Sequence, residues 1–257
     1  MERQPGGVQS VERALTLLEA LADAGGELSL TEIAAAAGLP LATIHRLVRT
    51  LMDRGYVAQL PSRRYSLGPR LINLGDRASG MLADWAQPRL LELVGALGET
   101  ANLSMLDGDK VAYVAQVQSP HPMRMFTEVG NRVPLHSTGV GKVLLAQLND
   151  RDLAVLVRRI GLPALTPASI TNAESFAAEV RAAGDRGYAL DDEETQVGVR
   201  CVAVPLVGAP GAFALSVSGP AVRMTSDVVQ RAVPLLRSAA RDLVADLTRG
   251  QSDRPSA

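Results

Sequence analysis

Three runs of apolar side chains with helical spacing occupy the first part of the chain. The first run, residues 8–22, has an apolar face that consists of Val11, Leu15, Leu18 and Leu21. A second, short helix is predicted from Ser29 to Gly38, because Ser29 and Glu32 have the spacing of a reciprocal N-terminal cap. Pro40 then opens a third helix, whose apolar positions are Ile44, Leu47, Val48 and Leu51.

The polar side of the third helix predicts a DNA-binding surface. The residues expected to point away from the core are Thr43, His45, Arg46, Arg49 and Thr50. Two short helices joined by a tight turn, the second rich in hydroxyl, imidazole and guanidinium groups, are typical of a helix-turn-helix. Residues 56–60 and 65–67 predict two short strands around Arg63 and Arg64, as in a wing. The sequence does not distinguish base-reading arginines from phosphate contacts.

The distribution of charge supports this interpretation. The whole chain has 26 basic and 27 acidic residues, hence a net charge of −1. Residues 40–80 nevertheless contain seven arginines against two aspartates, a local net charge of +5. Such an excess fits contact with phosphates, although a solvated surface can have the same composition.

The pattern changes after residue 68. Residues 69–98 predict a helix with interruptions at Gly75, Gly80 and Pro88. Its apolar stripe fits an interdomain helix and dimer surface, or equally packing within one chain; it comprises Leu71, Leu74, Ala78 and Leu82. Strands and helices then alternate: a hairpin around 107–109, helices at 138–148, 150–159, 173–186 and 226–247, and strands at 188–191, 199–207 and 212–218. This order indicates an α+β sensor-like sandwich.

Composition excludes several classes of protein. The single cysteine, Cys201, excludes an internal disulfide framework and a multi-cysteine metal site. No apolar stretch is long enough to span a membrane and no secretory signal opens the chain, so we expect a cytoplasmic protein. The run 136–143 lacks the glycine and hydroxyl positions of a phosphate-binding loop, and the acidic run 191–194 lacks the ligand spacing of a cation site. We therefore expect no metal and no cofactor.

The second half offers a different kind of site. The loop 137–141 leads directly into a helix, where unpaired N–H groups can bind an anion. Ser216 and Ser218 share one face of their strand. Cys201 lies in an apolar strand, where a small core residue is the ordinary interpretation. Together with an acidic residue, these groups suit a small, oxygen-rich organic acid.

Residues 8–75, and above all SLTEIAAAAGLPLATIHRLVRTLMDRGYVAQLPSRRYSLG, resemble the winged helix-turn-helix of the IclR family of bacterial transcriptional regulators. The segments NRVPLHSTGVGKVLLAQL, DDEETQVGVRCVAVPL and ALSVSGPAVRMT resemble its GAF-like effector-binding domain. The resemblance implies an α+β protein of two domains: a winged helix-turn-helix at 8–68, a linker helix at 69–84 and an effector domain at 85–250.

The resemblance also implies a repressor that binds a double-stranded DNA operator as a homodimer, or as a dimer of dimers. The expected DNA contacts are Ser29, Thr31, Thr43, His45, Arg46, Arg49, Arg63 and Arg64. The implied effector is a glyoxylate-, pyruvate- or ureide-type acid. Its expected contacts are the backbone at Gly139 and Val140 and the side chains of Asp191, Cys201, Ser216 and Ser218. A shorter turn at 208–212 departs from the family pattern and puts the register at Ser216 in question.

Two other functions are compatible with parts of the sequence. Cys201 beside Arg200 is the one candidate thiolate of a redox sensor or enzyme, but it precedes an apolar run. An architectural DNA-binding protein without ligand control would leave the alternation of Ser216 and Ser218 with apolar residues unexplained.

Overall fold

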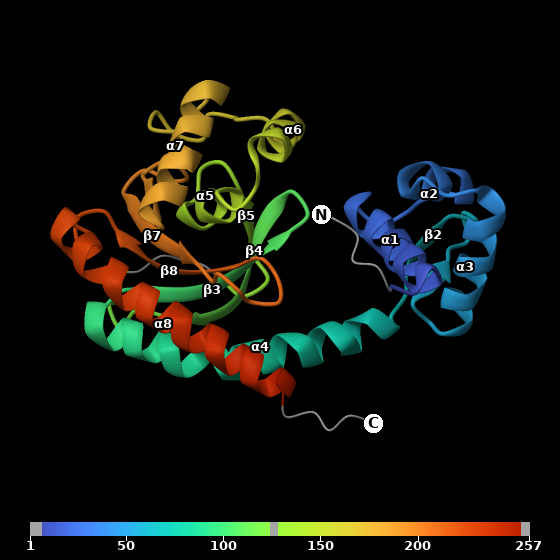
Figure 1. Ribbon diagram of the computed structural model, residues 1–257, viewed down its shortest axis with the longest axis horizontal. Helices are drawn as coiled ribbons and strands as arrows, with labels where there is room; N and C mark the ends of the chain where they lie inside the picture. The colour runs from blue at the N-terminus through green and yellow to red at the C-terminus, as the bar shows by residue number, and fades with distance from the viewer. Residues whose placement is uncertain (1–6, 124–127, 253–257) are drawn as a thin grey trace. The chain divides into compact units, whose positions relative to one another are not determined.

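The computed structural model describes residues 7–123 and 128–252. The chain divides into two compact units, one up to Ala78 and one from Ser79 onward. Helix α4 (Arg70–Leu97) begins in the first unit and ends in the second (Figure 1). The helix starts just after the boundary expected at residue 68 and continues through the one expected at residue 84; those domain limits stay a prediction.

The first unit is a winged helix-turn-helix. It contains α1 (Gln9–Asp23), α2 (Leu30–Ala37), α3 (Leu41–Asp53) and an antiparallel hairpin of β1 (Val57–Gln59) and β2 (Tyr65–Leu67). The predicted reciprocal cap is confirmed, since Ser29 Oγ accepts from Glu32 N and Glu32 Oε2 accepts from Ser29 N. Gly38 ends α2 in the left-handed conformation, which turns the chain into α3.

The core of this unit corrects the predicted face of α1. Leu17 and Leu21 are fully buried, whereas Val11 and Leu15 are 54% and 52% exposed. Leu21 is therefore buried as predicted and Leu18 packs partly buried against the core, while Leu17 takes the place predicted for Leu15. Ile44 and Val48 of α3 are buried as predicted.

The second unit is built on a six-stranded antiparallel sheet in the order β5-β4-β3-β8-β7-β6. Its strands are β3 (Thr100–Asp107), β4 (Lys110–Val117), β5 (Arg132–Pro134), β6 (Ala189–Asp192), β7 (Val199–Pro205) and β8 (Phe213–Pro220). Its helices, besides the end of α4, are α5 (Gly139–Leu145), α6 (Asp150–Ile160), α7 (Ala173–Arg186) and α8 (Ser226–Ser252). The predicted hairpin at 107–109 is confirmed; β5 was not predicted.

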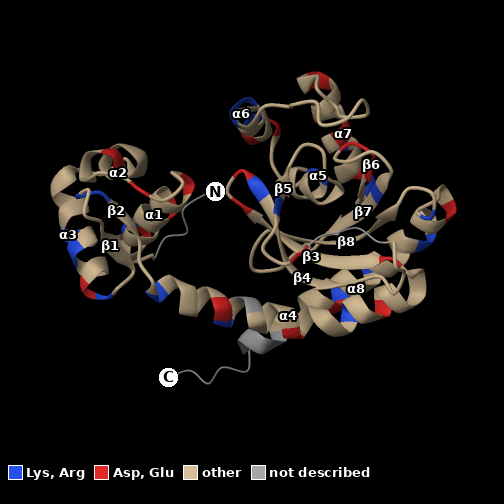
Figure 2. Cartoon of the chain, turned by 180° about the vertical axis from the view of Figure 1, so that it is seen from behind, with Lys and Arg blue, Asp and Glu red and all other residues tan. Residues whose placement is uncertain are grey.

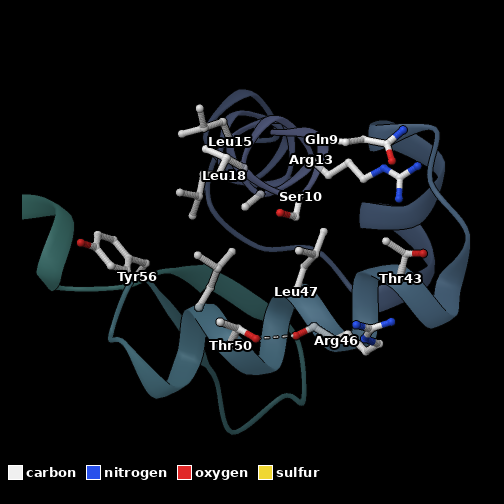
Figure 3. A pocket seen from close by; sticks show the side chains of 13 residues that line it. Gln9, Ser10, Arg13, Leu15, Leu18, Thr43, Arg46, Leu47, Thr50 and Tyr56 are labelled. Carbon is white, nitrogen blue, oxygen red and sulfur yellow. Dashed lines mark hydrogen bonds between the residues drawn. The ribbon is translucent and has the colours of Figure 1, made fainter. Parts of the chain in front are cut away.

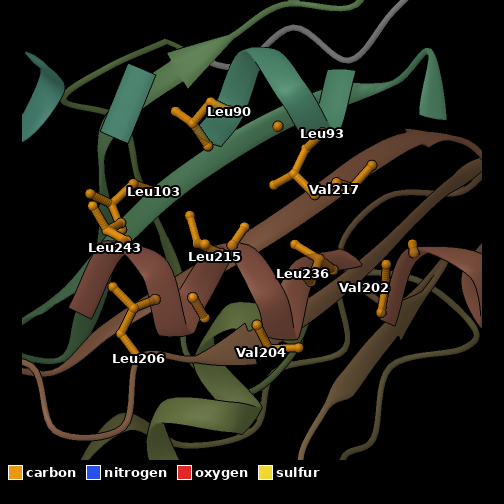
Figure 4. Close-up of a cluster of buried hydrophobic side chains, with 14 of the residues drawn as sticks. Leu90, Leu93, Leu103, Val202, Val204, Leu206, Leu215, Val217, Leu236 and Leu243 are labelled. Atoms are coloured by element: carbon orange, nitrogen blue, oxygen red, sulfur yellow. The ribbon is translucent and has the colours of Figure 1, made fainter. Parts of the chain in front are cut away.

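Helices cover both faces of the sheet, so each strand alternates between two cores. The end of α4 and all of α8 pack on one face with Leu103, Leu215 and Val217 (Figure 4). The short helices α5, α6 and α7 lie over the other face (Figure 1). The second face also carries the polar residues described below.

Helix α4 is continuous, which corrects the predicted interruptions at Gly75, Gly80 and Pro88. A proline inside a helix costs about 3 kcal/mol because it removes one hydrogen bond and crowds the preceding turn. Ala86, Leu90 and Leu93 are buried on either side of Pro88 in the core beneath the sheet. This packing offsets the cost.

Candidate functional site

The exposed side of α3 carries the basic groups of the first unit. His45, Arg46 and Arg49 are all exposed, and at about 100° per residue they fall within one narrow sector of the helix. The buried Ile44 and Val48 lie on the opposite side. Figure 2 shows the basic positions of α3 among those of the unit. The arrangement exposes guanidinium and imidazole groups on a helix anchored by its other face.

Thr43 and Thr50 lie at one edge of this sector, next to α1. Thr43 is half-buried and lines a groove of about 670 Å³ between α1 and α3, with Leu15 and Leu47 (Figure 3). Thr50 lines the same groove, and its hydroxyl donates to the carbonyl oxygen of Arg46 at 3.0 Å. Thr43 is therefore outside the hydrophobic core, as predicted, but it faces the groove beside α1, and its contact with DNA stays a prediction.

The wing and the start of α2 are tied together by polar contacts. Arg64 donates to the carbonyl oxygen of Glu27 at 3.0 Å and forms an ion pair with Glu32 at 2.8 Å. The hydroxyls of Ser29 and Thr31 are 3.1 Å apart. Arg63 is exposed at the tip of the hairpin with φ of 62°. Of the two wing arginines, only Arg63 extends away from the domain.

In the second unit, strand pairing aligns the predicted effector residues in rows across one face of the sheet. The first row is Asp191, Cys201, Ser218 and Thr100. The second row is Ala189, Ala203, Ser216, Asn102 and Gln116. The third row is Pro205, Ala214, Ser104 and Tyr113. Ser216 is thus in the register that places it beside Ser218, despite the short turn that precedes β8.

Helix α5 begins directly over the first two rows. A side chain at Gly139 would lie 3.2 Å from the carbonyl oxygen of Ala189 and 3.4 Å from that of Cys201. The structure therefore brings the N-terminus of α5 next to β6 and β7, together with Asp191, Cys201, Ser216 and Ser218, all of which are buried. Among the described residues, the N–H groups of Gly139 and Val140 donate to no protein acceptor.

A buried charge cluster flanks this arrangement. Asp191 Oδ1 accepts from the backbone N–H groups of Glu194 at 2.8 Å and Thr195 at 3.2 Å. Lys142, which is fully buried on α5, forms an ion pair with Glu194. Burial raises the pKa of the Asp191 carboxyl, while these N–H groups and Lys142 lower it. Asp191 therefore holds the connection after β6 as well as facing the site.

The Cys201 thiol is not activated. Burial raises its pKa to about 12, and the Asp191 charge acts in the same direction. Ser216 and Lys142 oppose this shift only in part, and the Ser216 hydroxyl makes no hydrogen bond of normal geometry. A neutral, buried thiol lacks the electropositive, accessible setting of a reactive cysteine.

Sequence reasoning missed the polar residues of β3 and β4 on the same face. Asn102 Nδ2 donates to Ser218 Oγ at 3.4 Å, and Gln116 Nε2 donates to Asn102 Oδ1 at 2.8 Å. Ser104 and Tyr113 are also buried there. A signal was present, because Asn102 and Ser104 alternate with apolar residues as Ser216 and Ser218 do.

No three His, Cys, Asp or Glu side chains of residues 7–123 and 128–252 are grouped so that they could hold a metal ion. In the same part of the chain, no helix has the length and apolar character that crossing a bilayer requires.

Comparison with known proteins identifies both units. Residues 10–61 match the IclR helix-turn-helix domain, and residues 78–245 match the family described as bacterial transcriptional regulator IclR C-terminal. The chain is 36% identical to the transcriptional repressor IclR of Escherichia coli over 93% of this chain and 89% of that protein.

Solved structures share the fold. The IclR protein of Thermotoga maritima has a TM-score of 0.63 with 27% identity, covering 93% of this chain and 98% of that one. An IclR homologue from Microbacterium hydrocarbonoxydans, crystallised with 4-hydroxybenzoate, has a TM-score of 0.62 with 24% identity, covering 94% of this chain and all of that one.

Proposed function

The chain belongs to the IclR family of DNA-binding transcriptional regulators, and on that basis we propose that it is a repressor whose hold on operator DNA changes when a small organic acid binds in its second unit. The family supplies the class of function. The residues, the effector and the direction of control are our proposals, and each rests on a separate observation.

The DNA contacts come from α3, the wing and the start of α2. Our proposal is that Arg46 and Arg49, both exposed on α3, contact guanine edges in the major groove, where a bidentate contact contributes about 1–3 kcal/mol of discrimination. His45, Arg63, Ser29 and Thr31 position the domain on the backbone. Arg64 can contact the DNA backbone only if its ion pair with Glu32 breaks. Thr43 contacts DNA only at the margin of the interface, because it lines the groove beside α1.

The effector site lies under α5. The free N–H groups of Gly139 and Val140 hold the carboxylate of the acid, as the first turn of a helix favours an anion. Ser216 and Ser218 donate hydrogen bonds to the oxygens of the acid, and Asp191 accepts one from its hydroxyl or hydrated carbonyl. The uncharged Cys201 side chain lines the site. Glyoxylate, pyruvate and ureide-type acids are the first candidates.

The regulator acts as a homodimer, which places two copies of α3 on the halves of a palindromic operator. Exposed apolar residues on α1 and on the first half of α4 support this assembly, namely Val8, Val11, Leu15, Ile72, Leu74 and Met81. We extend this proposal to a dimer of dimers. A regulator of this class works in the cytoplasm, on the chromosome, and without catalysis, cofactor or membrane.

The observation that carries the proposal is the fully buried Ser216 hydroxyl, which makes no hydrogen bond of normal geometry among the described residues. Buried hydroxyls are nearly always hydrogen-bonded, so an orphan on a polar row indicates a ligand. The test is a gel shift with the promoter of the protein's own or neighbouring genes, with and without the candidate acids. An acid that releases or tightens the complex supports the proposal; no salt-sensitive DNA binding refutes it.

An architectural DNA-binding protein would bind the same DNA without any response to acids in that experiment. The thiolate alternative has no support, since Cys201 is buried and neutral and the relatives are regulators.

A further inference from the structure

Two more buried hydroxyls lie on the effector face, in the third row of the sheet. Ser104 Oγ is fully buried and has no hydrogen-bond partner. Tyr113 is 5% exposed, pairs directly with Ser104 across β3 and β4, and its hydroxyl makes no hydrogen bond within the described residues. None of the contacts assigned above uses either group.

These hydroxyls lie within reach of the first site. Ser104 is the diagonal neighbour of Ser216, because Ser216 pairs with Asn102 two positions earlier on β3. Diagonal neighbours in a sheet are about 7–8 Å apart, with their side chains somewhat closer. Tyr113 is on the same face of the sheet, because it pairs directly with Ser104 on the neighbouring strand.

The charges nearby decide what can bind there. Burial, Cys201 and Asp191 all raise the pKa of Tyr113, so its phenol stays a neutral donor. Lys142, the buried cation of α5, is paired with Glu194. Neutral hydroxyls without a free cation suit an uncharged hydroxyl or carbonyl group better than a second carboxylate.

We propose that Ser104 and Tyr113 form a second polar subsite, which binds an uncharged oxygen group at the far end of an acid of about three to five carbons. This inference rests on the proposed function, because the carboxylate end is held at α5. It also favours a longer effector than glyoxylate, whose two carbons cannot reach both rows.

The test is calorimetric titration of the full chain with glyoxylate, with pyruvate and with three matched pairs of acids: propionate and 3-hydroxypropionate, butyrate and 4-hydroxybutyrate, and valerate and 5-hydroxyvalerate. We expect at least one hydroxy acid to bind about tenfold more tightly than its parent acid, as one added hydrogen bond allows. Tyr113→Phe and Ser104→Ala should each reduce that preference below about threefold while leaving the parent acid unchanged.

Tyr188→Phe is the matched control, because it removes a phenol oxygen elsewhere and keeps the ring that packs under Arg186. It should keep the full preference. Acids that bind with no preference for the terminal hydroxyl, or a preference that survives Tyr113→Phe, overturn the subsite alone. Absence of binding by every acid, including glyoxylate and pyruvate, refutes the effector half of the proposed function and the subsite with it.

Discussion

Replacing Ser216 by alanine should separate function from stability. The Ser216 hydroxyl is fully buried and without a partner, and an unpaired buried hydroxyl costs about 1–3 kcal/mol. Alanine removes that cost and leaves a cavity the size of one oxygen atom, which costs about 0.5 kcal/mol. We therefore expect the free energy of unfolding to rise by about 0.5–2.5 kcal/mol without ligand, while the response of operator binding to the effector is lost.

Urea unfolding followed by tryptophan fluorescence measures this effect. Trp85, the single tryptophan of the sequence, packs against the core of the second unit and therefore reports on that unit. Ser119→Ala is the matched control. Ser119 Oγ donates to Gly98 O at 2.6 Å and accepts from His121 N at 3.2 Å. Loss of these bonds should lower the free energy of unfolding by about 1–2 kcal/mol.

Two results would refute the reasoning. If Ser216→Ala destabilises the protein as much as Ser119→Ala does, the Ser216 hydroxyl has a structural role and no ligand needs to be assigned to it. If the variant responds to the effector like the parent protein, the site lies elsewhere. In both cases the row of polar residues under α5 would lose its functional meaning.

Three further predictions concern other parts of the molecule. Arg46→Ala should weaken operator binding by about 1–3 kcal/mol and relax specificity at one base pair, as measured by gel shifts with single-base variants; an unchanged base profile would contradict the recognition-helix assignment. Gly141→Ala should destabilise the second unit by at least about 2 kcal/mol in urea unfolding, because its Cβ would lie 2.1 Å from the carbonyl oxygen of Leu135. The pKa of Cys201 is about 12 in the folded protein and near 9 in the unfolded chain, so the unfolded state loses the thiol proton first. The free energy of unfolding should therefore fall between pH 9 and 12. Cys201→Ala should remove that part of the pH dependence in unfolding experiments.

The elements of the fold could largely be predicted from hydrophobic periodicity and from the residues that begin and end helices, because those signals are local. Ser29, Glu32 and Gly38 delimit α2 as their chemistry requires. Pro88 was misleading, since the packing that stabilises α4 around it comes from strands far away in sequence. The face of α1 was predicted only in part for a related reason: Leu15 and Leu17 are equally apolar, and the position of α2 and α3 decides that Leu17 is buried.

The residues of the proposed effector site could likewise be predicted only in part. Ser216 and Ser218 were found because they alternate within one strand. Asn102 and Ser104 alternate in the same way more than one hundred residues earlier, but their meaning depends on the pairing of β3 with β8. That pairing joins two strands whose separation in sequence exceeds the range of any local pattern. A site assembled from rows across a sheet is therefore visible in the sequence only in pieces.

The sheet also provides a physical route by which ligand binding can matter outside the site. On β3 and β8, polar residues face α5 while their immediate neighbours Leu103, Leu215 and Val217 pack against α4 and α8. A ligand that draws β3 and β8 toward α5 therefore acts on the packing of α4, which continues into the first unit. Packed interfaces change between discrete arrangements. The acid can therefore change operator affinity by no more than the difference between its affinities for two such arrangements. Substitutions at Leu103 or Val217 that alter this packing should change the size of the response without changing the groups that hold the acid.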